Sequence, residues 1–225
     1  MGNASTCTQE HSAAGPFELK GPARQPFDPI TIMAHWVTLP LVVALVVTGL
    51  MHSQLEDRPW APSLLWAHRS LGVIIWTVTV TRLLWRLTGA EFPEFPSSMT
   101  RLHRLAARLS EYGLYALLLV QPLSGLEQTI ARGKPFELLL WTVPALVPKD
   151  LGHVVLFYAL HKLGAWCFIG LVSLHAAAAL FHHFVRRDDV LEAMAPFLRR
   201  RRAPDPIAVE NTDSDTTGTV SDIAR

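Results

Sequence analysis

Apolar residues occur in four long blocks along this chain of 225 residues, and short polar stretches separate the blocks. A helix of about 20 residues crosses the roughly 30 Å apolar core of a bilayer. The blocks lack the alternation of barrel strands, so helices are expected. We predict spans at residues 30–52, 64–87, 112–130 and 154–185. The pattern therefore predicts an all-α fold, an integral membrane four-helix bundle.

The composition agrees with a membrane protein. Half of the residues are hydrophobic, 17% are charged, and the formal net charge is only +1. Membrane lipid is therefore the expected surrounding, and no basic excess points to nucleic acid. The chain holds only two cysteines and no CxxCH sequence, which excludes a disulfide framework and covalently attached haem.

Basic residues predict the orientation of the bundle. One side of it gathers most arginines, namely Arg86, Arg101, Arg104, Arg108, Arg186, Arg187 and Arg199 to Arg202. The connections on the other side hold four cations, Arg58, Arg132, Lys134 and Lys149. By the positive-inside bias, both termini are expected in the cytoplasm. We predict a polar N-terminal tail (1–29), a membrane domain (30–197) and a tail (198–225) that is first basic and then acidic and disordered.

Four histidines are expected at two depths within the membrane. His161 and His175 are fourteen residues apart, so on one helix their side chains point the same way, about 21 Å apart along the axis. In the predicted orientation, His175 and His35 lie in the inner half of the membrane. His68 and His161 lie in the outer half.

Two histidines at one depth, from different helices, can bind the two faces of one haem iron. The four histidines thus predict two bis-histidine haems between the helices, as the pairs His35/His175 and His68/His161. A single intramembrane histidine would be explained equally well by a hydrogen bond between helices.

Three groups of nearby residues are weaker candidates. Gly72, Gly164 and Gly170 leave room for a flat macrocycle, although small residues also serve helix packing. Arg82 lies deep enough in the second span to favour a partner such as a haem propionate or a lipid phosphate. His182 is the best substitute ligand, because it follows His175 by seven residues.

Other features are expected to be structural. Arg69 and Lys162, beside the outer histidines, either pair with propionates or extend to the surface. His52, His103 and His153 fall near membrane boundaries, where a solvated ring is expected. The third span contains no histidine and a Gln-Pro-Leu-Ser-Gly centre that predicts a kink. We find no internal repeat.

The sequence resembles the bacterial cytochrome b561 family of dihaem four-helix membrane proteins. The resemblance covers about residues 30 to 197 and rests on ITIMAHWVTLPL, LLWAHRSLGVIIW with TRLLWRL, IARGKPFELL, and ALHKLGAWCFIGLVSLHAAAALFHHF. It implies that the axial ligands of two non-covalent haems b are His35, His68, His161 and His175. It also implies a multi-pass protein of the bacterial inner membrane and one-electron transfer connected with the quinone pool.

We expect one-electron transfer across the membrane through two haems b, linked to the quinone pool, with ubiquinone or another acceptor. Superoxide is one candidate for a small one-electron donor, and no residue pattern selects it. One alternative is a cytochrome b anchor subunit that relays electrons from a respiratory dehydrogenase or hydrogenase, a redox partner protein. A second is a haem-free, histidine-lined metal transporter, although Glu127 is the sole acidic residue within the predicted spans. A structural scaffold would leave the paired histidines unexplained.

Overall fold

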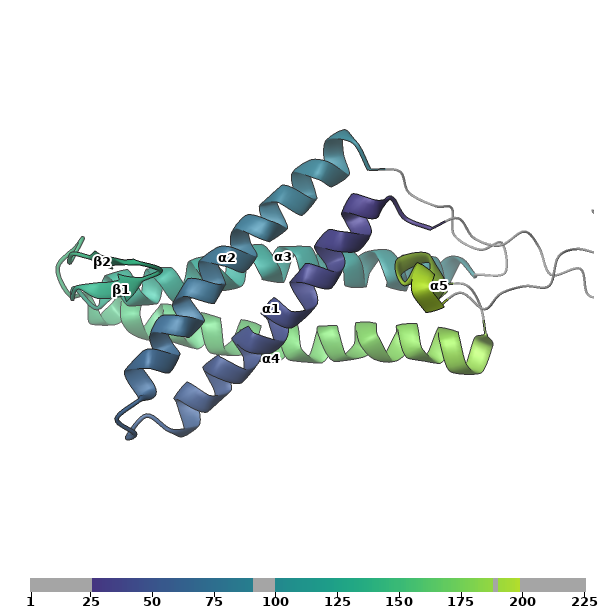
Figure 1. Ribbon diagram of the computed structural model, residues 1–225. Helices are drawn as coiled ribbons and strands as arrows, with labels where there is room; N and C mark the ends of the chain where they lie inside the picture. Colours follow the sequence, from purple (N-terminus) through teal and green to yellow (C-terminus); the bar gives the residue numbers. More distant parts are fainter. Residues whose placement is uncertain (1–25, 91–99, 188–189, 199–225) are drawn as a thin grey trace, which may run out of the picture.

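Four long helices form the protein in the computed structural model, which describes residues 26–90, 100–187 and 190–198 (Figure 1). They are α1 (Pro29–Gln54), α2 (Ala61–Thr88), α3 (Arg101–Ala131) and α4 (Leu151–Phe181). The prediction of an all-α bundle is confirmed. Most of the two predicted tails, at 1–25 and 199–225, lies outside the described residues.

Three helical segments are long and apolar enough to cross a membrane, by length and composition: Pro29–Gln54, Ala61–Thr88 and Leu151–Arg186. They bury little of their surface inside the protein; Val43 is 54% exposed and Leu163 is 64% exposed. Apolar side chains so widely exposed need a lipid surrounding. Helix α3, which contains the predicted span at 112–130, is not among these segments, because polar residues interrupt its apolar stretch.

Polar caps set the helix starts. Helix α3 begins at Arg101, eleven residues before the predicted span, because the Thr100 side chain accepts a hydrogen bond from the His103 amide. Asp150 caps α4 in the same way by accepting from the His153 amide. Helix α3 continues through Pro122 in one helical segment.

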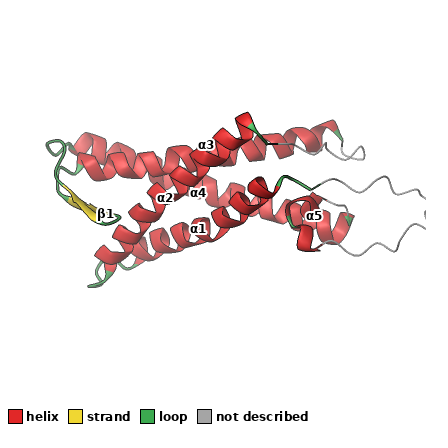
Figure 2. Ribbon diagram, turned by 45° about the horizontal axis from the view of Figure 1, so that its top comes forward, coloured by secondary structure: helices red, strands yellow, loops and turns green. Residues whose placement is uncertain are grey.

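The four helices form two pairs. Helix α1 packs along α2 and α3 packs along α4, while α2 and α3 connect the pairs (Figures 1 and 2). In the connecting contact, a Cβ added to Gly72 would lie 3.9 Å from the Cβ of Pro122. Within the described residues, α1 and α4 share no extensive contact. Side chains that reach from α1 to α4 therefore cross a space between the two pairs.

A short antiparallel hairpin, which the sequence pattern did not predict, connects α3 and α4. Its strands are β1 (Phe136–Leu138) and β2 (Trp141–Val143). The hairpin is attached to α2, because the Leu139 amide donates to Ser70 Oγ (2.9 Å) and Trp66 Nε1 donates to the Leu139 carbonyl (3.0 Å). We refer to this end of the bundle as the hairpin end.

The opposite end is closed by the segment after α4. There α4 continues into the π-helix η1 (His182–Arg186), followed by α5 (Val190–Met194) and η2 (Pro196–Leu198). The segment folds back onto α1, where Trp36 Nε1 donates to the Met194 carbonyl (2.9 Å). Figure 1 shows α5 at the end of the bundle opposite the hairpin. We refer to it as the α5 end.

Candidate haem sites

Two pairs of histidine rings connect the α1–α2 pair to α4. The ring centres of His35 (α1) and His175 (α4) are 6.4 Å apart, with the planes inclined by 53°. The ring centres of His68 (α2) and His161 (α4) are 6.1 Å apart, with perpendicular planes. The structure thus brings together the same side chains that their predicted depths paired. Their role as iron ligands stays a prediction.

The spacing of the rings fits iron coordination. An imidazole nitrogen lies about 2 Å from a transition metal that it binds, so two rings on opposite faces of one iron have centres about 6 Å apart. The observed 6.1 Å and 6.4 Å agree with this distance. Rings in direct hydrogen-bond or stacking contact could be closer. Both pairs therefore fit a bis-histidine haem.

Helix α1 holds the His68 ring. Nδ1 of His68 donates a hydrogen bond to the Leu45 carbonyl (3.0 Å) and lies 3.3 Å from Thr48 Oγ1. A Cβ added to Gly49 would lie only 2.9 Å from Cε1 of the same ring. Because a carbonyl only accepts, Nδ1 carries the proton, and Nε2 is the nitrogen left for a metal.

Helix α3 holds the His161 ring in the same way, with a backbone carbonyl, a hydroxyl group and a glycine. Nδ1 of His161 donates to the Gln121 carbonyl (3.0 Å) and lies 3.1 Å from Ser124 Oγ. A Cβ added to Gly125 would lie 3.0 Å from Cε1 of the ring. In addition, the Gln121 amide donates to the His161 carbonyl (2.9 Å). The predicted span without a histidine therefore positions a histidine of its neighbour.

The pair at the α5 end has different surroundings. Among the described residues, neither the His35 ring nor the His175 ring has a hydrogen-bond partner. Arg82 of α2 lies close enough to interact electrostatically with both rings. Its Nη1 donates to Thr38 Oγ1 (2.9 Å), and its guanidinium lies 5.5 Å from the centre of the Tyr115 ring. Arg82 thus contacts groups of the protein, whereas its expected partner, a haem propionate or a lipid phosphate, stays a prediction.

Two of the predicted glycines face another helix. Gly72 faces Pro122 of α3, and a Cβ on Gly164 would meet the side-chain oxygen of Gln121. A Cβ on Gly170 would have no described neighbour within 4 Å. The glycines against histidine rings are Gly49 and Gly125, which the apolar pattern of the sequence did not indicate. A hydroxyl residue followed by glycine, Thr-Gly in one span and Ser-Gly in another, was the available signal.

Cations lie near the pair at the hairpin end. Arg69 donates from Nη1 to the Glu137 carbonyl (3.3 Å) and covers the Phe136 ring at 5.7 Å. Its Nε atom is buried without a partner among the described residues. The ammonium of Lys162 lies 5.7 Å from the centre of the Tyr158 ring on its own helix. Both cations are therefore held locally by carbonyl or ring contacts.

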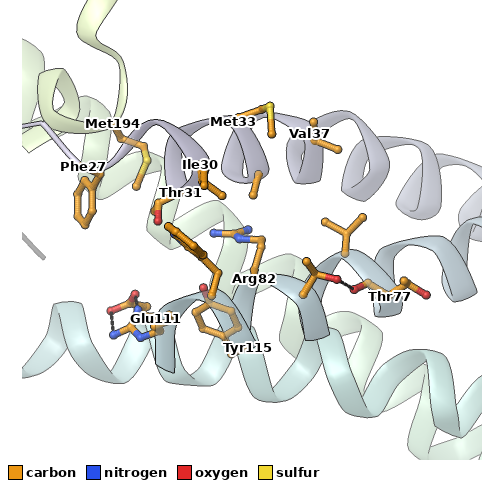
Figure 3. A pocket seen from close by; sticks show the side chains of 15 residues that line it. Phe27, Ile30, Thr31, Met33, Val37, Thr77, Arg82, Glu111, Tyr115 and Met194 are labelled. Carbon is orange, nitrogen blue, oxygen red and sulfur yellow. Dashed lines mark hydrogen bonds and ion pairs between the residues drawn. The ribbon is translucent and has the colours of Figure 1, made fainter. Parts of the chain in front are cut away.

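A cavity of about 280 Å³ lies between α1, α2 and α3 at the α5 end (Figure 3). Its walls are mainly apolar, and Arg82, Tyr115 and an ion pair between Arg86 and Glu111 supply polar groups. Met33, on its border, is 63% exposed. Because this exposed apolar side chain belongs to a membrane-crossing helix, the cavity borders the lipid.

The other predicted histidines lie at helix ends. Nδ1 of His52 is 3.2 Å from the Ala61 carbonyl, and His153 pairs with Asp150 at 2.7 Å. Nδ1 of His103 is 2.9 Å from Thr100 Oγ1. His182 begins the π-helix, with its ring 6.2 Å from that of Phe181. None of these rings joins either pair in the described structure.

Comparisons with known proteins agree with this arrangement. Residues 26–197 match the family of prokaryotic cytochrome b561. Cytochrome b561 homolog 2 of Escherichia coli (strain K12) is 33% identical over 170 residues, which cover 73% of this chain and 88% of the relative. Cytochrome b561 homolog 1 of the same organism is 28% identical over 179 residues, covering 76% and 97%.

A third relative is described as a probable superoxide oxidase CybB of Yersinia pestis. It is 26% identical over 167 residues, covering 74% of this chain and 94% of the relative. Together, the matches support b-type haem binding and an electron-transfer role in a bacterial membrane. The chain belongs to the prokaryotic cytochrome b561 family.

Proposed function

We propose that this protein carries electrons across the bacterial inner membrane, from a small one-electron donor to the quinone pool, with two haems b bound by His35/His175 and His68/His161. The observation that carries the proposal is the pair of ring separations, 6.4 Å and 6.1 Å, at two levels of one bundle. Haem b supplies the one-electron iron couple when it is bound.

Helix α4 fixes the distance between the two sites. It contributes one histidine to each pair, and the fourteen residues between them correspond to about 21 Å of helix. The helix is continuous from Leu151 to Phe181, so both ligands belong to one rigid element. The chain thereby holds two redox sites at a constant separation across the bilayer.

The cavity at the α5 end supports ubiquinone as the acceptor. Its apolar walls suit a prenylated ring, and its border faces the lipid in which quinones dissolve. Arg82 and Tyr115 line it and carry the donors that quinone carbonyls require. Arg82 is also the residue that interacts with both His35 and His175, so the cavity adjoins that pair.

Cations at the hairpin end support a small anionic donor such as superoxide. Arg69 and Arg132 lie close enough for their positive charges to interact, and Glu137 contributes one opposing charge. The remaining excess of positive charge attracts anions from solution. With both termini in the cytoplasm, the hairpin end faces outward and the cavity lies in the inner leaflet.

The proposal is tested with the full chain in vesicles that contain a short-chain ubiquinone. We expect external superoxide to reduce the haem irons, which is seen as the absorbance bands of reduced haem b. We also expect one quinol to form for every two superoxide ions consumed. A His68→Ala variant is expected to form no quinol above the uncatalysed level. A wild-type protein that holds haem but forms no quinol would contradict the proposed reaction.

The hairpin favours one alternative, a cytochrome b anchor subunit for a respiratory dehydrogenase or hydrogenase. Leu140 and Trp141 at its tip are 89% and 70% exposed, as in a surface that contacts a partner protein. Purification from native membranes distinguishes the two functions. A redox subunit recovered in equal amount with the chain would favour the anchor function, and recovery of the chain alone favours the proposed one.

A further inference from the structure

The hydrogen bonds to His68 and His161 reveal a repeated device. Three positions with the spacing i, i+3 and i+4 recur on α1 and α3, and each set holds a histidine of the following helix. We call these sets the α1 cradle (Leu45, Thr48, Gly49) and the α3 cradle (Gln121, Ser124, Gly125). Only the hydroxyl and glycine positions are chemically alike, because the first position acts through its backbone carbonyl.

In both cradles, the hydroxyl must accept the hydrogen bond from histidine. Thr48 donates its own proton to the Ala44 carbonyl (2.7 Å), and Ser124 donates to the Gln121 carbonyl (2.8 Å). The lone pairs of each hydroxyl are therefore free to receive the Nδ1 proton, together with the nearby carbonyl. Each ring thus donates toward two oxygen atoms from a single nitrogen.

Hydrogen bonding at Nδ1 changes the ligand at Nε2. An acceptor on the outer nitrogen of a metal-bound imidazole increases its basicity and fixes its tautomer and orientation. A more basic ligand stabilises the oxidised metal ion and so lowers the reduction potential. Both ligands of the hairpin-end pair receive this effect, since both rings lie in cradles.

The pair at the α5 end lacks such hydrogen bonds, because among the described residues its rings have no hydrogen-bond acceptor. The positive charge of Arg82 acts on both rings, while the negative charge of Glu111 acts on His175 as well. A nearby cation favours the less positive, reduced state of a redox centre. Arg69 also acts on His68, so the expected difference between the pairs depends on the cradles.

We propose that the α1 and α3 cradles are positioning sites that lower the reduction potential of the haem at His68/His161 below that of the haem at His35/His175. The inference rests on the proposed function, since it requires a haem at each pair. It assigns roles to Thr48, Gly49, Ser124 and Gly125, and it makes the α5 end the favoured location of an electron.

The test is a spectroelectrochemical titration of the purified full chain and of a variant that combines Thr48→Val with Ser124→Ala. We expect the reduction potential of the lower-potential haem to rise. The expected change is about tenfold in the equilibrium constant for reduction, which is about 59 mV for a one-electron couple. The other component should not move. A His161→Ala variant identifies the component at the hairpin end, which it should remove.

Two control variants separate hydrogen bonding from packing. A variant that exchanges the two hydroxyl residues, Thr48→Ser with Ser124→Thr, keeps both acceptors and should keep both potentials. Thr129→Val removes a hydroxyl of α3 that donates to the Gly125 carbonyl and has no described hydrogen bond to a histidine ring, so it should also change neither potential. The variant with Thr48→Val and Ser124→Ala, called the hydroxyl-free variant, could lose only the hairpin-end haem. If the variant with Thr48→Ser and Ser124→Thr, called the exchange variant, keeps both haems, that result would also support the proposed role of the cradles.

Unchanged potentials in the hydroxyl-free variant, or an equal shift in the exchange variant, would overturn the inference. So would assignment of the hairpin-end haem to the higher potential. These results leave two haems in the wild-type protein and so leave the proposed function standing. A wild-type protein without two haems would instead contradict the proposed function itself.

Discussion

At the scale of single residues, Gly49 and Gly125 provide space that no other amino acid can leave. An added Cβ would lie 2.9 Å from the His68 ring and 3.0 Å from the His161 ring. Such distances require the ring to move, because each glycine belongs to a helix whose backbone is fixed by packing. The position of each imidazole therefore depends on a glycine, which has no side chain, on the neighbouring helix.

We predict that Gly49→Ala combined with Gly125→Ala lowers the haem content from two to about one per chain. The ring displacement moves Nε2 of both ligands at the hairpin end, while the pair at the α5 end is untouched. Haem quantification that finds two haems in the Gly49→Ala and Gly125→Ala variant would refute this role.

The residue-scale features differ in how far the sequence could predict them. The pairing of His35 with His175 and of His68 with His161 followed from depth and helical period. The cradles did not, because a backbone carbonyl is present at every residue and leaves no trace in the sequence. Which carbonyl meets His68 depends on the rotation of α1 about its axis, and this rotation is a result of tertiary packing.

At the scale of elements, the four helices were predictable because long apolar blocks are strong signals. The residues at which the helices begin and end were less predictable. The N-terminal turns of α3 contain Arg101, Arg104 and Arg108, which an apolar pattern excludes from a span although they are helical. The hairpin escaped prediction because strands of three residues, such as Phe136–Leu138, are too short to show alternation.

The start of α4 gives a prediction about acid stability. The hydrogen bond from the His153 side chain, together with that from the His153 amide, lowers the pKa of Asp150 from its ordinary value of 3.8. A carboxyl group whose pKa is lowered on folding stabilises the protein above its ordinary pKa, and this contribution is lost as the pH falls through the lowered value.

We therefore expect the thermal midpoint of the wild-type protein to fall between about pH 5 and about pH 2 more than that of Asp150→Asn. Circular dichroism of detergent-solubilised protein measures both midpoints. Asparagine is an equally good N-cap but carries no titratable group, so it isolates the charge. Equal acid dependence of the two proteins would show that Asp150 contributes nothing to it.

At the scale of the whole molecule, α4 holds one histidine of each pair, and the α1–α2 pair holds the other two. The spaces between these two units are where the rings approach to 6.1 Å and 6.4 Å without touching. Helix α3, which has no histidine in its middle, packs against α4 and fixes His161. Each helix thus has a defined part in holding two histidine pairs at opposite ends of the bundle.

The most direct test of the central claim is a pyridine haemochrome quantification of the purified full chain beside two variants. One variant combines His35→Ala with His175→Ala, and the other combines His68→Ala with His161→Ala. We predict two haems b per chain in the wild type and one in each variant, since each variant removes the rings of one pair only. One haem or none in the wild type, or variants that keep both haems, would contradict the assignment of the two pairs.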